Sequence, residues 1–291
     1  MSTTYQARKN VLVTGVTSGV GHSVAKQLRQ RGCFVIATCR NEQQAQELMT
    51  SQVCDMTVRV DLGDIPLVQT LPEQLRAAGI DDLAGFIHCA AVTGAGPIET
   101  IGMEEARRIF EVNVFGLLAL IQASTEFLRK GKGRMVLTGS VAGFSVWPML
   151  GIYGATKHAM EALADAARRE LWPWGIQVSL IRPGGIKTRM VKLHLEEMNA
   201  KIAALQGREK EHYLALYQSY IKTIGDGGNT SATPEYVAEK IVKVFESPKP
   251  KAVYCVGTDC KVLRFIDLLF PDSTVDFLAK KLFRVSPPTR A

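Results

Sequence analysis

The sequence lacks the features that mark secreted, metal-binding and membrane-spanning chains. Its six cysteines are scattered, with no C-x-x-C pair and no cluster of metal ligands. The first ten residues contain no apolar stretch of the secretory kind, and the apolar run at 114–122 is far too short to span a bilayer. We therefore expect a reduced, soluble, cytoplasmic protein without a bound metal.

Charge of one sign is in only modest excess. The 291 residues include 35 Lys or Arg and 28 Asp or Glu, and residues 240–291 alone hold 10 basic against 5 acidic side chains. Because no run of five basic residues and no basic-aromatic stripe occurs, nucleic acid is not an expected partner. The C-terminal excess could serve an acidic partner or a membrane surface, or have no function.

What the chain does contain is a regular alternation of short apolar strands and helices. Strands are expected at 10–14, 33–38, 56–60, 83–88, 134–138 and 176–181. Six such repeats predict one doubly wound, Rossmann-type parallel α/β sheet with helices on both faces. With no internal repeat or linker, residues 1–291 are expected to form one domain. Ligands bind such sheets beyond the carboxyl ends of the strands.

The first strand end carries a glycine-rich turn. Gly15, Gly19 and Gly21 precede a helix expected over 20–31. Glycines let the backbone approach a pyrophosphate, and the amides and dipole of a helix N-terminus favour its charge. The spacing G-x-x-x-G-x-G gains weight from its place directly after a strand. The predicted cofactor contacts of this turn are Gly15, Thr17, Ser18, Gly19, Val20 and Gly21.

The next strand ends indicate which dinucleotide would bind. No acidic residue follows the second strand to hold the ribose 2′-hydroxyl of NAD, whereas Arg40 offers donors suited to the 2′-phosphate of NADP. NADP(H) is therefore expected, with NAD(H) as the alternative, although Arg40 could be an ordinary surface arginine. Asp61, followed by Leu62, could reach the adenine or cap a helix. Cys89 and Ala90, after the fourth strand, are small enough for close cofactor approach.

Residues 138–157 supply groups for proton transfer. Tyr153 and Lys157 are four residues apart and share one face of an expected helix. A lysine ammonium beside a tyrosine favours the phenolate and lowers the tyrosine pKa. The Ser140 hydroxyl could hold a substrate oxygen against Tyr153, which would then exchange a proton with an alcohol or carbonyl. Such pairs also arise by chance, so the prediction depends on the glycine turn as well.

Asn113 lies in the middle of a long helix expected at 103–129, where asparagine is a poor helix former. It could bind a water, kink the helix or make a plain buried hydrogen bond. This helix and another expected at 152–174 carry apolar residues on more than one face. We therefore expect a homodimer or homotetramer that pairs through them.

Together these residues resemble the classical short-chain dehydrogenase/reductase family over about residues 8–190. Thr14-Gly15 with Gly19 and Gly21 resembles its cofactor turn. Asn113, Ser140, Tyr153 and Lys157 match its catalytic tetrad in order and in separations of 27, 13 and 4. The closest pattern is that of NADP-preferring members that act on steroids, retinoids or other hydrophobic carbonyls.

The resemblance implies a role for each residue. Tyr153 would be the general acid or base, Lys157 would lower its pKa and bind the nicotinamide ribose, Ser140 would orient the substrate oxygen, and Asn113 would hold a water of a proton relay. Further nicotinamide contacts would come from Pro183, Gly184, Ile186 and Thr188. One departure is His88-Cys89-Ala90-Ala91, which replaces the family's usual Asn-Asn-Ala-Gly. Cys89 cannot reproduce the amide of the second Asn, which normally supports the cofactor region.

The predicted activity is hydride transfer between NADP(H) and a hydrophobic ketone or secondary alcohol, in the direction of carbonyl reduction. The alternatives are an NAD-dependent alcohol dehydrogenase and a non-catalytic dinucleotide sensor. Residues 189–230 are expected to form a helical substrate lid, in which His194 and Lys192 are the polar candidates. Its apolar stripes, like the loop at 144–150, would be pocket wall or core: Leu195, Met198, Ile202, Leu205, Tyr213, Tyr217 and Tyr220. The tail at 258–291 would shield the pocket, join subunits or touch a membrane, the last being the least expected.

Overall fold

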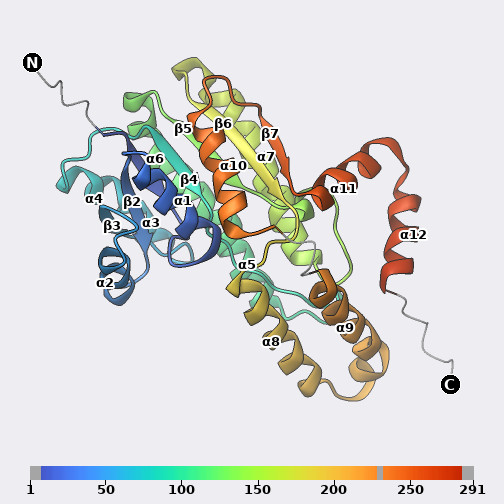
Figure 1. Ribbon diagram of the computed structural model, residues 1–291. Helices are drawn as coiled ribbons and strands as arrows, with labels where there is room; N and C mark the ends of the chain where they lie inside the picture. The colour runs from blue at the N-terminus through green and yellow to red at the C-terminus, as the bar shows by residue number, and fades with distance from the viewer. Residues whose placement is uncertain (1–7, 228–231, 284–291) are drawn as a thin grey trace, which may run out of the picture.

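The computed structural model describes residues 8–227 and 232–283, which are arranged around one parallel sheet in the order β3-β2-β1-β4-β5-β6-β7 (Figure 1). Its strands are β1 Asn10–Val13, β2 Phe34–Cys39, β3 Met56–Arg59, β4 Gly85–His88, β5 Arg134–Thr138, β6 Gln177–Pro183 and β7 Val253–Val256. The last residues of the predicted lid and tail, 228–230 and 284–291, lie outside the described residues. The order reverses between β1 and β4, which is the switch point where such sheets bind ligands.

The six predicted strands are confirmed, with ends that differ by one or two residues, and the structure adds a seventh. β7 pairs with β6 from Leu180 and Val253 to Pro183 and Val256. Strand β7 is hard to predict from local pattern, because it has only four residues, follows a segment rich in proline and lysine, and lies half-buried at the sheet edge.

Helices cover both faces of the sheet, as the alternating pattern predicts. On one face α1 (Gly19–Gln30) and α10 (Pro234–Glu246) pack together over the side chains of Val11, Val13 and Ile87. On the other face the main helices are α6 (Gly116–Gly131) and α7 (Gly151–Leu171), which pack over Leu12 and Phe86. These strand residues are fully buried and alternate between the faces, which is the pattern of a central parallel strand. The remaining sheet helices are α2 Glu42–Thr50, α3 Ile65–Gln69 and α4 Leu71–Ala77.

The long helix expected at 103–129 is interrupted. It consists of α5 (Met103–Phe110), a π-helical turn (Glu111–Phe115) and α6, with Asn113 fully buried in the π turn. Isolated π turns inside α-helices often mark functional sites. The run Met103–Gly131 is long and apolar enough to cross a bilayer, yet Leu117, Leu120 and Leu128 are fully buried against the sheet. Its apolar character is that of a core helix.

Two helices after β6 extend away from the sheet (Figure 1). They are α8 (Arg189–Ala204) and α9 (Gly207–Gly227), here called the α8–α9 pair. A third apolar cluster joins them to the loop before α7 and to the C-terminal helix α12 (Asp272–Phe283), which follows α11 (Thr258–Leu269). The predicted stripes are therefore helical. Met198, Leu205, Tyr217 and Tyr220 are buried in that cluster, so most of both stripes is packed core.

Candidate functional site

The glycine turn after β1 has a backbone that only glycine adopts easily. Gly15 and Gly19 have φ angles of +71° and +60°, and a Cβ on Gly21 would lie 2.3 Å from the Gly15 carbonyl oxygen. A Cβ on Gly15 would lie 2.9 Å from the Ala90 nitrogen, and one on Gly19 would touch the Thr188 methyl. Thr17 and Ser18 are exposed, and Val20 is half-buried. The turn thus brings predicted residues of three strand ends together and forms an open cradle that fits a pyrophosphate.

Thr14, the last residue before the turn, ties β1 to the segment after β4. Its Oγ1 accepts hydrogen bonds from the amides of Cys89 and Ala90, at 3.1 and 3.2 Å. Amides only donate, so both acceptor positions of the hydroxyl are used and its proton must point to the Nδ1 of His88, 3.0 Å away. This fixes His88 as the tautomer with its proton on Nε2. The Thr14 hydroxyl therefore gives the cofactor loop the support that Cys89 cannot give.

His88 is fully buried and remains neutral, because burial, with Lys157 nearby, lowers its pKa to about 3. Its Nε2 has no hydrogen-bond partner in the described part of the chain. Burial also raises the pKa of the Cys89 thiol to about 11, so this cysteine is a thiol and not a thiolate. The Cys89 Sγ lies 3.5 Å from the Thr138 hydroxyl. His88 is thus an uncharged packing group, and Cys89 is an uncharged, partly exposed thiol.

Arg40 and Asp61 lie at the outer strand ends. Arg40 is exposed directly after β2, and its backbone amide donates to the Gln44 side chain at 3.0 Å. Its guanidinium has no protein partner among the described residues. Asp61 holds the turn after β3 by accepting from the Gly63 amide, while Asp64 caps α3, so the helix-cap reading of Asp61 is wrong. Leu62 is buried in the core, because Gly116 packs closely against it.

The segment after β6 is held by a residue that the sequence did not indicate. Asp259, in the first turn of α11, accepts from the Gly185 amide at 2.7 Å, and any Cβ on Gly184 would collide with its carboxylate. Pro183 ends β6 and Ile186 pairs with Ala232 in an isolated bridge. Asp259 lies 74 residues beyond Gly185 and follows the unpredicted β7, so no local pattern could have found it.

Helix α11 also reaches the loop after Ser140. The ring of Phe144 has the guanidinium of Arg182 at 5.1 Å and that of Arg264, from α11, at 5.4 Å. Arg182 is itself paired with Glu161 of α7, with both side chains largely buried. These contacts fix the loop that follows Ser140.

Ser140, Tyr153 and Lys157 meet where β5 ends and α7 begins. The Ser140 Oγ accepts from the Ala142 amide at 3.1 Å and caps the short turn Val141–Gly143. Lys157 is only 2% exposed, and its Nζ donates to the Thr138 carbonyl at 3.2 Å. The same Nζ lies 5.7 Å from the centre of the Tyr153 ring. The predicted neighbours are thus together on one face of α7.

The acidity of this pair differs from the expectation. Burial raises the pKa of Tyr153 to about 12, with the Ser140 hydroxyl acting weakly in the opposite direction. Burial lowers the pKa of Lys157 to about 8. The expected lowering of the tyrosine pKa by the lysine is therefore wrong for the protein alone, because desolvation outweighs the charge of a lysine directed at Thr138. Near neutral pH Tyr153 is a phenol, which can donate a proton.

Asn113 clamps the chain after β4. Its Oδ1 accepts from the Val92 amide and its Nδ2 donates to the Val92 carbonyl, both at 2.9 Å, and Nδ2 also reaches the Thr156 hydroxyl at 3.2 Å. Thr156 in turn donates to the main-chain oxygen of Tyr153 at 2.7 Å. Both amide protons are therefore used within the protein, which is the buried hydrogen-bond reading of Asn113, and its π turn is the expected break in the helix.

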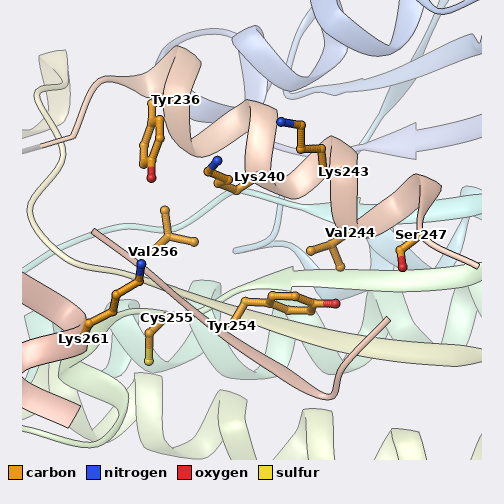
Figure 2. Close-up of a pocket in the computed structure, with 9 residues that line it drawn as sticks. All are labelled: Tyr236, Lys240, Lys243, Val244, Ser247, Tyr254, Cys255, Val256 and Lys261. Carbon is orange, nitrogen blue, oxygen red and sulfur yellow. The ribbon is translucent and has the colours of Figure 1, made fainter. Parts of the chain in front are cut away.

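Some of the C-terminal basic residues border a cavity apart from this edge (Figure 2). The cavity measures about 330 Å³ and lies between α10 and β7, where Lys240 and Lys243 extend from α10 and Lys261 from α11. None of the predicted site residues lines it. The basic excess and the cofactor cradle are therefore separate features.

Residues 9–199 match the family described as short chain dehydrogenase. The chain belongs to the short-chain dehydrogenase family. It is 32% identical to an NADPH-dependent 3-dehydrocapnine reductase of Ornithobacterium rhinotracheale, over 91% of this chain and 94% of that protein. It is 31% identical to a 17-beta-hydroxysteroid dehydrogenase type 6 of Rattus norvegicus, over 93% and 87%. A crystal structure of a short-chain dehydrogenase from Streptomyces avermitilis has the same fold, with a TM-score of 0.74, 21% identity and coverage of 97% and 99%.

Membership makes this short-chain dehydrogenase an oxidoreductase that acts on CH–OH groups and uses a nicotinamide dinucleotide. The glycine cradle fits such a cofactor on the geometry of this chain alone, because side chains at Gly15 and Gly21 would fill it. The six cysteines of the short-chain dehydrogenase are all free thiols.

The buried lysine of this short-chain dehydrogenase should cost stability. A lowering of its pKa from 10.5 to about 8 corresponds to roughly 3 kcal/mol against the charged form. Lys157→Met should therefore raise the free energy of unfolding at pH 7 by about 1 kcal/mol, after about 2 kcal/mol for the lost charged hydrogen bond to Thr138. From about pH 8 to 10.5 the unfolded chain holds a proton that folded Lys157 has released, so the wild type gains stability there and the difference shrinks.

Urea unfolding at several pH values measures this difference. Exposed Lys26 of α1 supplies the matched control, since Lys26→Met should change stability little at any pH. A less stable Lys157→Met protein at pH 7 would contradict the desolvation argument.

Proposed function

We propose that this protein reduces a hydrophobic ketone to a secondary alcohol with NADPH. The observation that carries the proposal is Tyr153, a half-buried phenol beside the Ser140 hydroxyl, at the strand edge that also holds the glycine cradle. A phenol with a pKa of about 12 suits the reductive direction, because it keeps its proton at neutral pH and can still protonate a far more basic alkoxide.

The residues have distinct tasks in this reaction. The hydroxyls of Ser140 and Tyr153 hold the carbonyl oxygen and orient it. The carbonyl carbon would face the bound nicotinamide, and the chemistry that NADPH would supply there is a hydride. The oxygen takes the proton of Tyr153, and the ammonium of Lys157 stabilises the phenolate that remains. Asn113 keeps α7 and the loop after β4 in register through Thr156 and Val92, and the second lone pair of its Oδ1 is the place for a relay water.

The cofactor would lie along the carboxyl edge of the sheet. Its pyrophosphate would rest on the turn 15–21, and its nicotinamide half between the segments at 89–90 and 183–188. Lys157 has ammonium protons left after its bond to Thr138, and these would bind the nicotinamide ribose. Asp61 would approach the adenine.

The preference for NADPH is supported by Arg40, an exposed guanidinium without a protein partner in the described chain at the end of β2. The relative from Ornithobacterium rhinotracheale is named as NADPH-dependent. A 2′-phosphate would pair with the arginine fork, which NADH cannot do.

The substrate would be largely apolar. Val146, on the loop before α7, and Met190 and Leu193, on α8, are between 42% and 51% exposed. Trp147 and Leu150 of the same loop pack against the third cluster. Methionine walls adapt to irregular shapes. The rat relative named as a hydroxysteroid dehydrogenase agrees with a bulky apolar substrate.

Assembly and location complete the proposal. Phe115 and Trp172, in the predicted pairing helices, are 50% and 72% exposed, which supports a homodimer or homotetramer. The proposed location is the cytoplasm. Light scattering at micromolar concentration measures the mass, and a monomer would contradict this part.

Tyr153→Phe tests the proton donor. It removes the hydroxyl and keeps the ring, so kcat for ketone reduction should fall at least about 100-fold while NADPH binding is retained. Tyr236→Phe, an exposed tyrosine of α10, serves as the control with unchanged rate. Turnover of Tyr153→Phe close to that of the wild type would rule out this role.

Arg40→Ala tests cofactor choice. A charged hydrogen bond to phosphate contributes roughly 1.5–3 kcal/mol, so the Kd for NADPH should rise by about tenfold or more and that for NADH should not change. Arg108→Ala on α5 is the matched loss of an exposed arginine. Titration by cofactor fluorescence gives both constants, and equal affinity of the wild type for the two cofactors would refute the preference.

A series of ketones of increasing apolar size tests the substrate class. Each additional Å² of buried apolar surface contributes roughly 25 cal/mol, so kcat/KM should rise with size until the pocket is full. Better turnover of small polar carbonyls than of steroid-sized ketones would show that the pocket is small and polar.

A further inference from the structure

A buried polar chain joins the α8–α9 pair to the segment after β4. His194 of α8 is 7% exposed and Tyr220 of α9 is 1% exposed. The Nε2 of His194 lies 2.9 Å from the Tyr220 hydroxyl, and its Nδ1 lies 3.3 Å from the hydroxyl of Thr93. Of the two polar candidates expected in the lid, Lys192 faces water, whereas His194 is buried.

These polar groups are placed against an otherwise apolar cluster. Tyr220 packs with Met149, Met198 and Tyr217 in the third cluster, where a polar group without a partner would be costly. Burial lowers the pKa of His194, so the ring is neutral. A neutral imidazole donates through one nitrogen and accepts through the other, and both flanking hydroxyls can take either role. The chain is therefore satisfied only while the α8–α9 pair stays in this register.

The chain continues to the catalytic helix. Thr93 follows Val92, whose peptide is clamped by Asn113, and Asn113 reaches Thr156, which holds the main chain of Tyr153. Tyr220 lies near enough to Tyr153 for that residue to contribute, after burial, to the raised pKa of Tyr220. These hydrogen bonds, together with the peptide unit between Val92 and Thr93, thus connect α9 to Tyr153.

A second contact of the α8–α9 pair is of another kind. Lys201 of α8 binds Glu105 and the carbonyl of Ala95. The side chains of Lys201 and Glu105 are 26% and 22% exposed. Ion pairs that water reaches tolerate small shifts. The buried chain through His194 has stricter geometry, because displacing it leaves several polar groups unsatisfied.

We propose that Thr93, His194 and Tyr220 are a hydrogen-bond latch that holds the α8–α9 pair over Tyr153 and thereby sets the size selectivity of the reaction. The proposal rests on the proposed ketone reduction for its substrate part. The three residues are positioning residues: they hold the apolar wall at the distance that lets a bulky ketone contact the pair and reach Tyr153. A small ketone gains little from that wall and depends less on the latch.

Thr93→Val and Tyr220→Phe each remove one hydroxyl with little change in shape. Amide hydrogen exchange over 189–227 should quicken about tenfold in either variant, and the double variant should add little, since one break opens the chain. The kcat/KM for a steroid-sized ketone should fall about tenfold, the value for acetone-sized ketones should change less than about twofold, and the Kd for NADPH should stay constant.

Ser219→Ala is the matched control. It removes a hydroxyl from α9 one residue before Tyr220, but that hydroxyl binds Phe283 of α12 and not the latch. Exchange in the latch variants equal to that in Ser219→Ala would overturn the proposal, and so would an equal loss of activity on large and small ketones. A wild type that reduces no ketone would refute the proposed function instead, and the exchange rates would still decide whether the latch exists.

Discussion

The site depends on the hydroxyl of Thr14. Two amides donate to it and it donates to one imidazole, so a single side chain fixes the end of β1, the segment after β4 and the tautomer of His88. Gly15 can then pass within van der Waals distance of Ala90, which is possible only without a side chain. The cradle, the clamp of Asn113 on Val92 and the latch on Thr93 all start from this fixed segment.

Tyr153 and Lys157 lie in an environment that is unfavourable to their charged forms. Burial opposes the charged forms of both Tyr153 and Lys157, and the fold supplies few compensating bonds to either before a ligand binds. Stability given up at a site is a common counterpart of reactivity, because the same desolvation strengthens every interaction with the bound substrate. The large apolar clusters on both faces of the sheet provide the stability that this arrangement costs.

Local sequence patterns predicted most of this site. The glycine turn, the Tyr153–Lys157 pair and Arg40 were identifiable because each lies directly after a strand or on one helix face, where spacing determines position. The patterns failed where long-range packing decides. Asp259 holds Gly185 across 74 residues, and no local pattern indicates such a contact. The pKa of Tyr153 also went the other way from the expectation, because spacing shows which charge is near but not how much water is excluded.

Helix α11 holds two loops of the site from outside the part of the chain that matches the family. Through Asp259 it holds the turn at Gly185, and through Arg264 it packs on Phe144, yet it lies outside residues 9–199 that define the family match. Substitutions in this late segment can therefore reshape the cofactor and substrate loops while every residue of the shared motif stays unchanged. In a chimera that joined the shared part of this chain to the C-terminal part of a relative, the residues that contact these loops would come from the relative.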